Sequence, residues 1–129
     1  MIAIDTNLLV RYLTGDDEVQ CKKVDHLIDR YPGEGAIFIA DIVLVEIEWV
    51  LQSVYKFSRT AIADALHTVL SVQQFTFSDR EMLQSALRKY KAGIPDFSDC
   101  LIGEEGRVRH VKTYTFDKQL KNDANFIVL

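Results

Sequence analysis

Five short runs of apolar or β-branched residues, separated by longer stretches with helical spacing, constrain the fold of this chain more than any other feature. The runs cover residues 2–4, 36–40, 74–77, 111–115 and 126–128. Short apolar runs that alternate with helices are typical of parallel strands joined by helical crossovers. Right-handed crossovers then place helices on both faces of the sheet. The sequence therefore predicts a three-layer α/β/α domain with a central, mostly parallel five-stranded sheet.

Helices are predicted where apolar residues repeat at helical spacing between residues that begin or end a helix. The expected ranges are 7–13, 16–30, 42–55, 58–71, 78–93 and 97–106. Asp41 is expected to cap the third helix, and Ser78 and Glu81 to form a capping box at the start of the fifth. No internal repeat, linker or second domain is evident, so residues 1–129 are expected to form a single domain.

Composition limits the possible functions. No apolar run approaches the roughly 18 residues needed to span a bilayer, and Asp5 interrupts the region that a signal peptide keeps apolar, so we expect a cytoplasmic protein without a membrane partner. The net charge of −4 argues against binding nucleic acid by bulk electrostatics. It does not exclude a nucleic-acid enzyme, because the charge of a bound cation is not counted.

The cysteines and histidines give no metal-binding pattern. Cys21 and Cys100 lie in apolar helical stretches without zinc-type spacing, and they are expected to be buried free thiols. His26 and His110 show no metal-type spacing with each other or with cysteine. We therefore treat His26 and His110 as incidental.

Asp5 follows the first apolar run directly, and Asp117 comes just past the fourth. In open α/β sheets, ligands bind beyond the carboxyl ends of the strands, so an acid at this position is placed where chemistry usually occurs. Asp5 has an alternative role as the N-cap of the helix that follows it. Taken alone, the residues around Asp5 favour the two roles equally.

Glu46 and Glu48 interrupt the strongly apolar helix expected over 42–55. Burying an ionised carboxylate costs several kcal/mol unless it is paired or bound to a metal. No arginine or lysine in this helix supplies a partner, so at least one of the two glutamates needs a cation or solvent. Their spacing leaves open which glutamate points into a site.

Asp96 and Asp99 precede or begin the sixth helix. Asp96 as N-cap with Asp99 three residues on would stabilise the start of this helix in the manner of a capping box. Alternatively, Asp99 shares a helix face with Ile102 and Gly103, and Gly103 is expected to leave open space one turn beyond the carboxylate. A carboxylate that faces such a space is a candidate metal ligand.

The predicted topology brings four of these carboxylates to one edge of the sheet. They are Asp5, Glu46, Asp99 and Asp117. Four converging carboxylates without basic partners repel one another, and a hard, oxygen-seeking cation removes the repulsion. The expected ion is Mg²⁺ or Mn²⁺.

Four segments together resemble the PIN-domain family, in particular the VapC toxins of bacterial and archaeal toxin–antitoxin pairs. They are residues 4–7, 44–51, 96–103 and 115–117. The resemblance implies a metal-dependent endoribonuclease. It implies that the ion is held by Asp5, Glu46, Asp99 and Asp117, with Asp96 as an additional acid, and that Thr6, Asn7 and Thr115 orient ligands, water or phosphate.

The resemblance also implies an RNA substrate, a homodimer and a VapB-like antitoxin protein that covers the site. Arg107, Arg109 and Lys112 are hypothesised to flank the cleft and contact the RNA. Two other functions stay open: a Mg²⁺-dependent phosphoaspartyl receiver or phosphatase using Asp117 and Lys118, and a non-catalytic, dimeric protein-binding module. In the last case the acids are helix caps, which need no metal.

Overall fold

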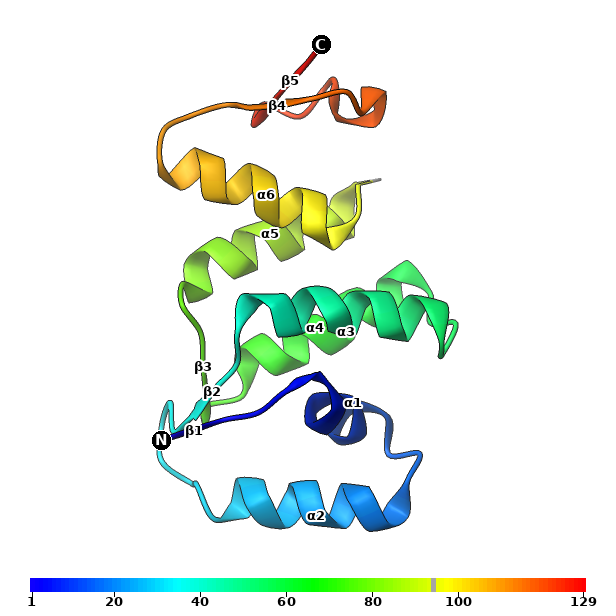
Figure 1. The fold of residues 1–129 in the computed structure, drawn as a ribbon, viewed down its shortest axis with the longest axis vertical. Coiled ribbons are helices and arrows are strands. Elements are labelled where there is room, and N and C mark those ends of the chain that lie inside the picture. Colours follow the sequence, from blue (N-terminus) through cyan, green and yellow to red (C-terminus); the bar gives the residue numbers. More distant parts are fainter. Residues whose placement is uncertain (94) are drawn as a thin grey trace. The chain divides into compact units, whose positions relative to one another are not determined.

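A computed structural model describes residues 1–93 and 95–129, and these divide into two units, Met1–Ser78 and Asp79–Leu129 (Figure 1). Ile94, which falls in the turn expected before the sixth helix, lies outside the described residues. The mixed α/β class and the parallel pairing are confirmed. Within the described residues, the five strands pair as a three-stranded and a two-stranded sheet rather than as one continuous sheet. The single domain expected over 1–129 stays a prediction.

The first unit contains three parallel strands and four helices. In chain order they are β1 (Ile2–Ala3), α1 (Thr6–Thr14), α2 (Glu18–Asp29), β2 (Ile37–Phe38), α3 (Asp41–Ser53), α4 (Arg59–Ser71) and β3 (Phe75–Thr76). β2 is the central strand, where Ile37 pairs with Ile2 on one side and with Phe75 on the other. α3 packs against α1 and α4, and α1 against α2. The apolar residues at helical spacing form the core, as the fully buried Leu9, Leu44 and Leu66 show.

The described residues of the second unit form two α-helices and two parallel strands. They are α5 (Arg80–Ala92), α6 (Phe97–Val108), β4 (Thr113–Thr115) and β5 (Phe126–Val128), with a short 3₁₀ helix at Lys118–Leu120. β4 and β5 pair from Thr113 opposite Phe126 to Thr115 opposite Val128. α5 and α6 pack together, and the rings of Tyr90 and Phe97 meet edge to face at 6.0 Å.

No helix in the described part of the chain is long and apolar enough to cross a membrane.

Two predicted helix caps are wrong. Asp41 is the first residue of α3, with Ala40 at the N-cap, and the Asp41 carboxylate accepts a hydrogen bond from the Ser78 hydroxyl (2.8 Å). The N-cap of α5 is Asp79, whose carboxylate accepts the Met82 N–H (3.0 Å). Because the Ser78 hydroxyl is used by a residue 37 positions earlier, the local sequence pattern does not reveal it.

The open space expected beside Gly103 is also wrong. A Cβ at this position would lie 2.7 Å from Cε2 of Phe126, and a Cβ at Gly106 would lie 2.9 Å from the hydroxyl oxygen of Thr113. Phe126 is on β5 and Thr113 on β4. α6 therefore lies close against both strands at two positions that have no side chain.

Gly103→Ala is expected to lower the free energy of unfolding by about 1–3 kcal/mol, because the added methyl group must displace the Phe126 ring. Urea denaturation measures the change. Gly33→Ala is the matched control, since its Cβ would meet nothing nearer than the Ala36 Cβ at 3.9 Å. Equal stability of the two variants would contradict the close packing of α6.

Next to Gly103, α6 carries the buried carboxylate of Glu104, which is 1% exposed. It accepts hydrogen bonds from Nε of Arg107 (2.6 Å) and Nδ2 of Asn125 (3.1 Å). Nζ of Lys89 lies 3.6 Å from the Glu104 carboxylate and 3.0 Å from that of Asp123. Burial raises the pKa of Glu104, but these hydrogen bonds outweigh burial and the pKa is lowered overall. The network ties α6 to α5 and to the segment before β5.

Glu104→Gln is expected to reduce stability by about 1–3 kcal/mol at neutral pH, because charge-assisted hydrogen bonds to a buried group are lost. A carboxyl whose pKa is lowered by folding stabilises above its unfolded pKa, here about 4.5, and this contribution disappears as the pH falls through the folded pKa. The stability difference from wild type should therefore shrink below about pH 4.5. Denaturation at several pH values tests this, with the exposed neighbour Glu105→Gln as control.

Candidate functional site

Asp5 lies between β1 and α1, at the carboxyl end of its strand as predicted. Its side chain also accepts the Leu8 N–H (3.1 Å), so its role as the N-cap of α1 is confirmed. A carboxylate has two oxygens and this cap uses one of them, so capping leaves room for a ligand. Asp5 is exposed, as is Asn7 on the first turn of α1, whereas Thr6 is half-buried.

The two glutamates of α3 have opposite environments. Glu46 is exposed, whereas Glu48 is buried at 6% exposure. A ligand from solvent reaches Glu46 without rearrangement of the helix, which favours Glu46 over Glu48 as the candidate. Ile42 and Trp49, one turn before and after Glu46, are each 61% exposed, so the face of α3 that carries Glu46 also presents large apolar side chains.

Three acids interact within the second unit. Burial raises the pKa of Asp99, and the negative charges of Asp96 and Asp117 raise it further. Asp96 is the N-cap residue of α6, but its side chain makes no capping hydrogen bond, so the expected capping box is not formed. Among the described residues, none of the three acids makes an ion pair.

Asp117 is fixed in a turn directly after β4. Its carboxylate accepts the Gln119 N–H (2.9 Å), and its own backbone N–H donates to the Thr115 hydroxyl oxygen (3.0 Å). Thr115 thus orients the backbone of Asp117. A similar strand–acid–cap arrangement occurs at Asp5 in the first unit.

The predicted carboxylates are divided between the units, with Asp5 and Glu46 in the first and Asp99 and Asp117 in the second. Neither unit by itself brings together, among its described residues, three or more His, Cys, Asp or Glu side chains that could hold a metal ion. The chemistry of the donors nevertheless fits Mg²⁺ or Mn²⁺, because all are carboxylates and the Asp99 pKa is raised by burial and then by neighbouring negative charge.

The family model of the PIN domain matches residues 2–124, nearly the whole chain. The chain belongs to the PIN-domain family. A VapC ribonuclease of Aquifex aeolicus (strain VF5) is 23% identical over 123 residues, which are 94% of this chain and 90% of that protein.

Two solved structures match this chain at low sequence identity. Mycobacterium tuberculosis VapC20, described as a sarcin–ricin loop cleaving toxin, is 14% identical, with 100% of this chain and 98% of that chain covered and a TM-score of 0.44. VapBC2 from Rickettsia felis, bound to a promoter DNA fragment, is 20% identical, with 100% and 98% covered and a TM-score of 0.38. Neither superposition is close enough to inform the site.

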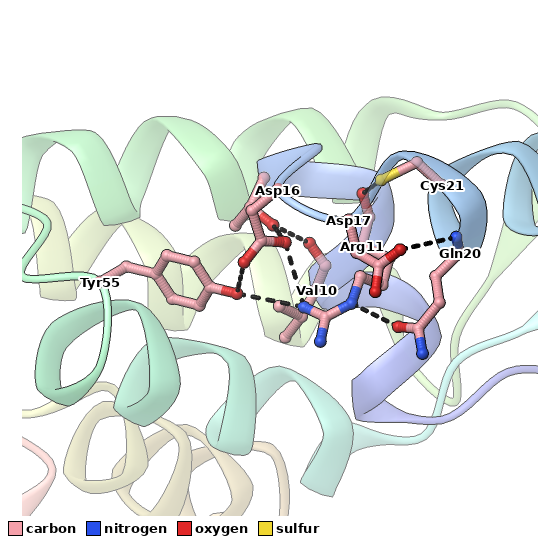
Figure 2. Close-up of polar contacts among 8 residues, drawn as sticks. Val10, Arg11, Asp16, Asp17, Gln20, Cys21 and Tyr55 are labelled. Carbon is pink, nitrogen blue, oxygen red and sulfur yellow. Dashed lines mark hydrogen bonds and ion pairs between the residues drawn. The ribbon is translucent and has the colours of Figure 1, made fainter.

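Sequence reasoning missed a polar cluster in the first unit of this PIN domain (Figure 2). Arg11 donates to Gln20 (2.6 Å), Asp16 (3.1 Å) and Tyr55 (3.1 Å), and the Tyr55 hydroxyl donates to Asp16 (2.6 Å). Hydrogen bonds from Tyr55 and Thr14 lower the pKa of Asp16. Asp16 was assigned to the first turn of α2, but it precedes that helix, whose N-cap is Asp17.

Three basic residues were hypothesised to flank the cleft. Each of them donates a hydrogen bond to an oxygen atom within the second unit. Arg107 pairs with Glu104, Arg109 donates to the Glu105 carbonyl (2.9 Å), and Lys112 donates to the carbonyl of Ala124. All three remain exposed.

The cysteines are free, as expected, although Cys21 is only half-buried and donates to the Arg11 carbonyl.

Asp117→Asn is expected to lower the pKa of Asp99 toward its ordinary value, because it removes one of the negative charges that raise it. Carboxyl-carbon NMR titration measures the pKa directly. Glu105→Gln removes a charge from the same helix without touching this group and should leave the Asp99 pKa unchanged. An unchanged value in Asp117→Asn would contradict the interaction of the two acids.

Proposed function

We propose that this PIN domain is a metal-dependent endoribonuclease of the VapC type. The observation that carries the proposal is the group of Asp96, Asp99 and Asp117. Burial and the negative charges of the other two acids raise the pKa of Asp99, and none of the three has an ion-pair partner among the described residues. Structural carboxylates in this chain, such as Asp16 and Glu104, are satisfied by hydrogen bonds and charge instead. The relative from Aquifex aeolicus, named a VapC ribonuclease, supports the same assignment.

In this proposal the ion is Mg²⁺ or Mn²⁺. Asp5, Glu46, Asp99 and Asp117 hold it, with Asp96 as an additional acid. When bound, such an ion lowers the pKa of a water molecule and neutralises charge that develops on the phosphate. Thr115 fixes the turn that presents Asp117, and the first turn of α1 places Thr6 and Asn7 next to Asp5. These polar side chains are proposed to orient the phosphate or the attacking water.

The proposed reaction is hydrolysis of an RNA phosphodiester. Water attacks phosphorus, the bond from phosphorus to the 3′ oxygen breaks, and the products are a 5′-phosphate and a 3′-hydroxyl. The carboxylates serve this reaction only when ionised. Because burial and the charges of Asp96 and Asp117 raise the pKa of Asp99, a bound cation would also hold Asp99 in its charged form.

The proposal includes a VapB-like antitoxin and a homodimer as partners, as expected for a VapC-type toxin. The face of α3 that carries Glu46 also exposes Ile42 and Trp49. A protein partner seated on these apolar side chains would cover Glu46 at the same time. Inhibition by an antitoxin would then follow from occlusion of a proposed ligand.

Asp99→Asn is expected to lower RNA cleavage by about 100-fold or more while preserving the fold, because asparagine keeps the shape and loses the charge. The assay uses purified protein, a mixed RNA pool and Mg²⁺ or Mn²⁺, with EDTA in a parallel reaction. Glu105→Gln, an exposed acid on the same helix, is the matched control and should cleave like wild type.

Three results would speak against the proposal. Cleavage that persists in EDTA excludes metal dependence. Equal cleavage by wild type and Asp99→Asn excludes this site. A protein that neither cleaves RNA nor binds Mg²⁺ by calorimetry would instead fit the non-catalytic binding module, whose acids are caps.

A further inference from the structure

A groove of about 590 Å³ lies between α1 and α2, within the first unit. Its apolar lining comes from Leu8, Val24 and Leu27. The polar residues that line it are cationic or neutral, and Lys23 and Arg30 are the exposed ones with a permanent positive charge. No acidic residue of the described chain lines the groove, although the chain as a whole has a net charge of −4.

The charges of α2 are separated onto different faces. Lys23, His26 and Arg30 recur at the spacing that places residues on one helix face, and all three line the groove. The acids of α2 are Glu18, Asp25 and Asp29, and none of them lines it. The groove is therefore locally basic on an acidic chain.

Lys23 and Arg30 differ from the other cations nearby. Within the described residues neither makes an ion pair, whereas Lys22 on the same helix lies 3.6 Å from Glu18. Arg11 also lines the groove, but it is held by Gln20, Asp16 and Tyr55 (Figure 2). The charge of Arg11 is thus neutralised by Asp16, whereas the charges of Lys23 and Arg30 have no acidic partner among the described residues.

Two residues that line the groove adjoin Asp5, one of the proposed metal ligands. Asn7 is two residues after Asp5, and the backbone N–H of Leu8 donates a hydrogen bond to the Asp5 carboxylate (3.1 Å). A ligand that follows the groove toward Asn7 consequently arrives beside a proposed metal ligand. A surface that binds anions unrelated to the proposed reaction would not need to adjoin Asp5.

We propose that the groove between α1 and α2 binds the phosphate backbone of the RNA substrate, with Lys23 and Arg30 each contacting a phosphate. This inference rests on the proposed ribonuclease function. At 1.5 Å per residue, the two side chains are spaced about 10 Å apart along α2, roughly three phosphate-to-phosphate steps along the axis of a helical strand. The aliphatic floor accommodates sugar and base surfaces, and the cations fix the strand beside Asp5 without reading its sequence.

An acidic protein segment is the other possible occupant, because an aliphatic floor with a basic rim also suits an amphipathic peptide. The position of the groove beside Asp5 favours RNA. In the proposed reaction the phosphodiester that is cleaved lies at Asp5, so the neighbouring phosphates of the strand must lie on the surface that adjoins Asp5. The experiment below includes both occupants.

The test compares Lys23→Gln/Arg30→Gln with Lys22→Gln/Lys56→Gln, which removes the same charge from exposed positions outside the groove. Binding of a short single-stranded RNA of mixed sequence is measured by fluorescence anisotropy in an Asp99→Asn background across a range of salt concentrations. The groove variant should bind several-fold more weakly, and its slope of log K against log salt should fall by about 1.4, or 0.7 for each lost phosphate contact. The control should keep the wild-type slope.

Cleavage kinetics give a second readout in the background that retains Asp99. Because the cations contact ground state and transition state alike, the groove variant should raise KM and leave kcat near that of the control. Circular dichroism melting establishes that both variants are folded.

The outcomes separate the two proposals. Metal-dependent cleavage by wild type, with groove and control variants equal in binding and KM, overturns the groove and leaves the ribonuclease function standing. Groove-dependent binding without any cleavage supports the groove and contradicts the nuclease. If a peptide of alternating glutamate and leucine binds wild type but not the groove variant, while RNA binding is the same in both, the occupant is a protein and the RNA proposal is wrong.

Discussion

The close approach of α6 to β4 and β5 is the constraint on which the second unit depends. It requires positions 103 and 106 to be glycine, since a Cβ at either would press on Phe126 or Thr113. The buried Glu104, between these two glycines, ties the same helix to Asn125 and Lys89. Asp99 lies one turn before this anchored stretch, and Asp117 lies just beyond β4. The packing of α6 on β4 and β5 contains no proposed catalytic group, but it keeps Asp99 and Asp117 close enough for the charge of Asp117 to raise the pKa of Asp99.

The carboxylates of the chain fall into two classes that their surroundings distinguish. Asp16 and Glu104 receive hydrogen bonds and face cations, and the pKa of each is lowered. Asp99 is partly buried beside other acids, and its pKa is raised. Folding stabilises the charge of the first class and opposes the charge of the second. An acid that folding disfavours in its charged form is a better candidate for binding a cation than one already satisfied by the protein.

Much of the fold follows from local sequence. The strand–acid junctions at Asp5 and Asp117 and the apolar periodicity of the helices are local patterns, and the structure contains each of those elements within a few residues of its expected range. The sequence errors arose where a partner is distant along the chain. Asp41 is engaged by Ser78 rather than capping α3, and the space beside Gly103 is filled by a ring 23 residues later, at Phe126.

The candidate site was predictable to a similar extent. Residue type and position after a strand singled out Asp5 and Asp117, and exposure now favours Glu46 over Glu48. The interaction of Asp96, Asp99 and Asp117 required the folded second unit, because Asp117 is separated from the other two by most of α6 and all of β4. The basic face of α2 was not identified from the sequence, because its significance depends on the adjoining groove.

The dual use of Asp5 affects how any substitution there is interpreted. One of its oxygens accepts the Leu8 N–H and thereby begins α1, the helix that also carries Arg11 and one wall of the groove. Alanine at this position removes a charge and a helix cap together, so lost activity would confound chemistry with a frayed helix. Serine retains the ability to cap without the negative charge. A single side chain therefore caps α1 and is proposed to bind the ion. Only a residue that caps a helix as well as aspartate does can separate the loss of ion binding from the loss of the cap.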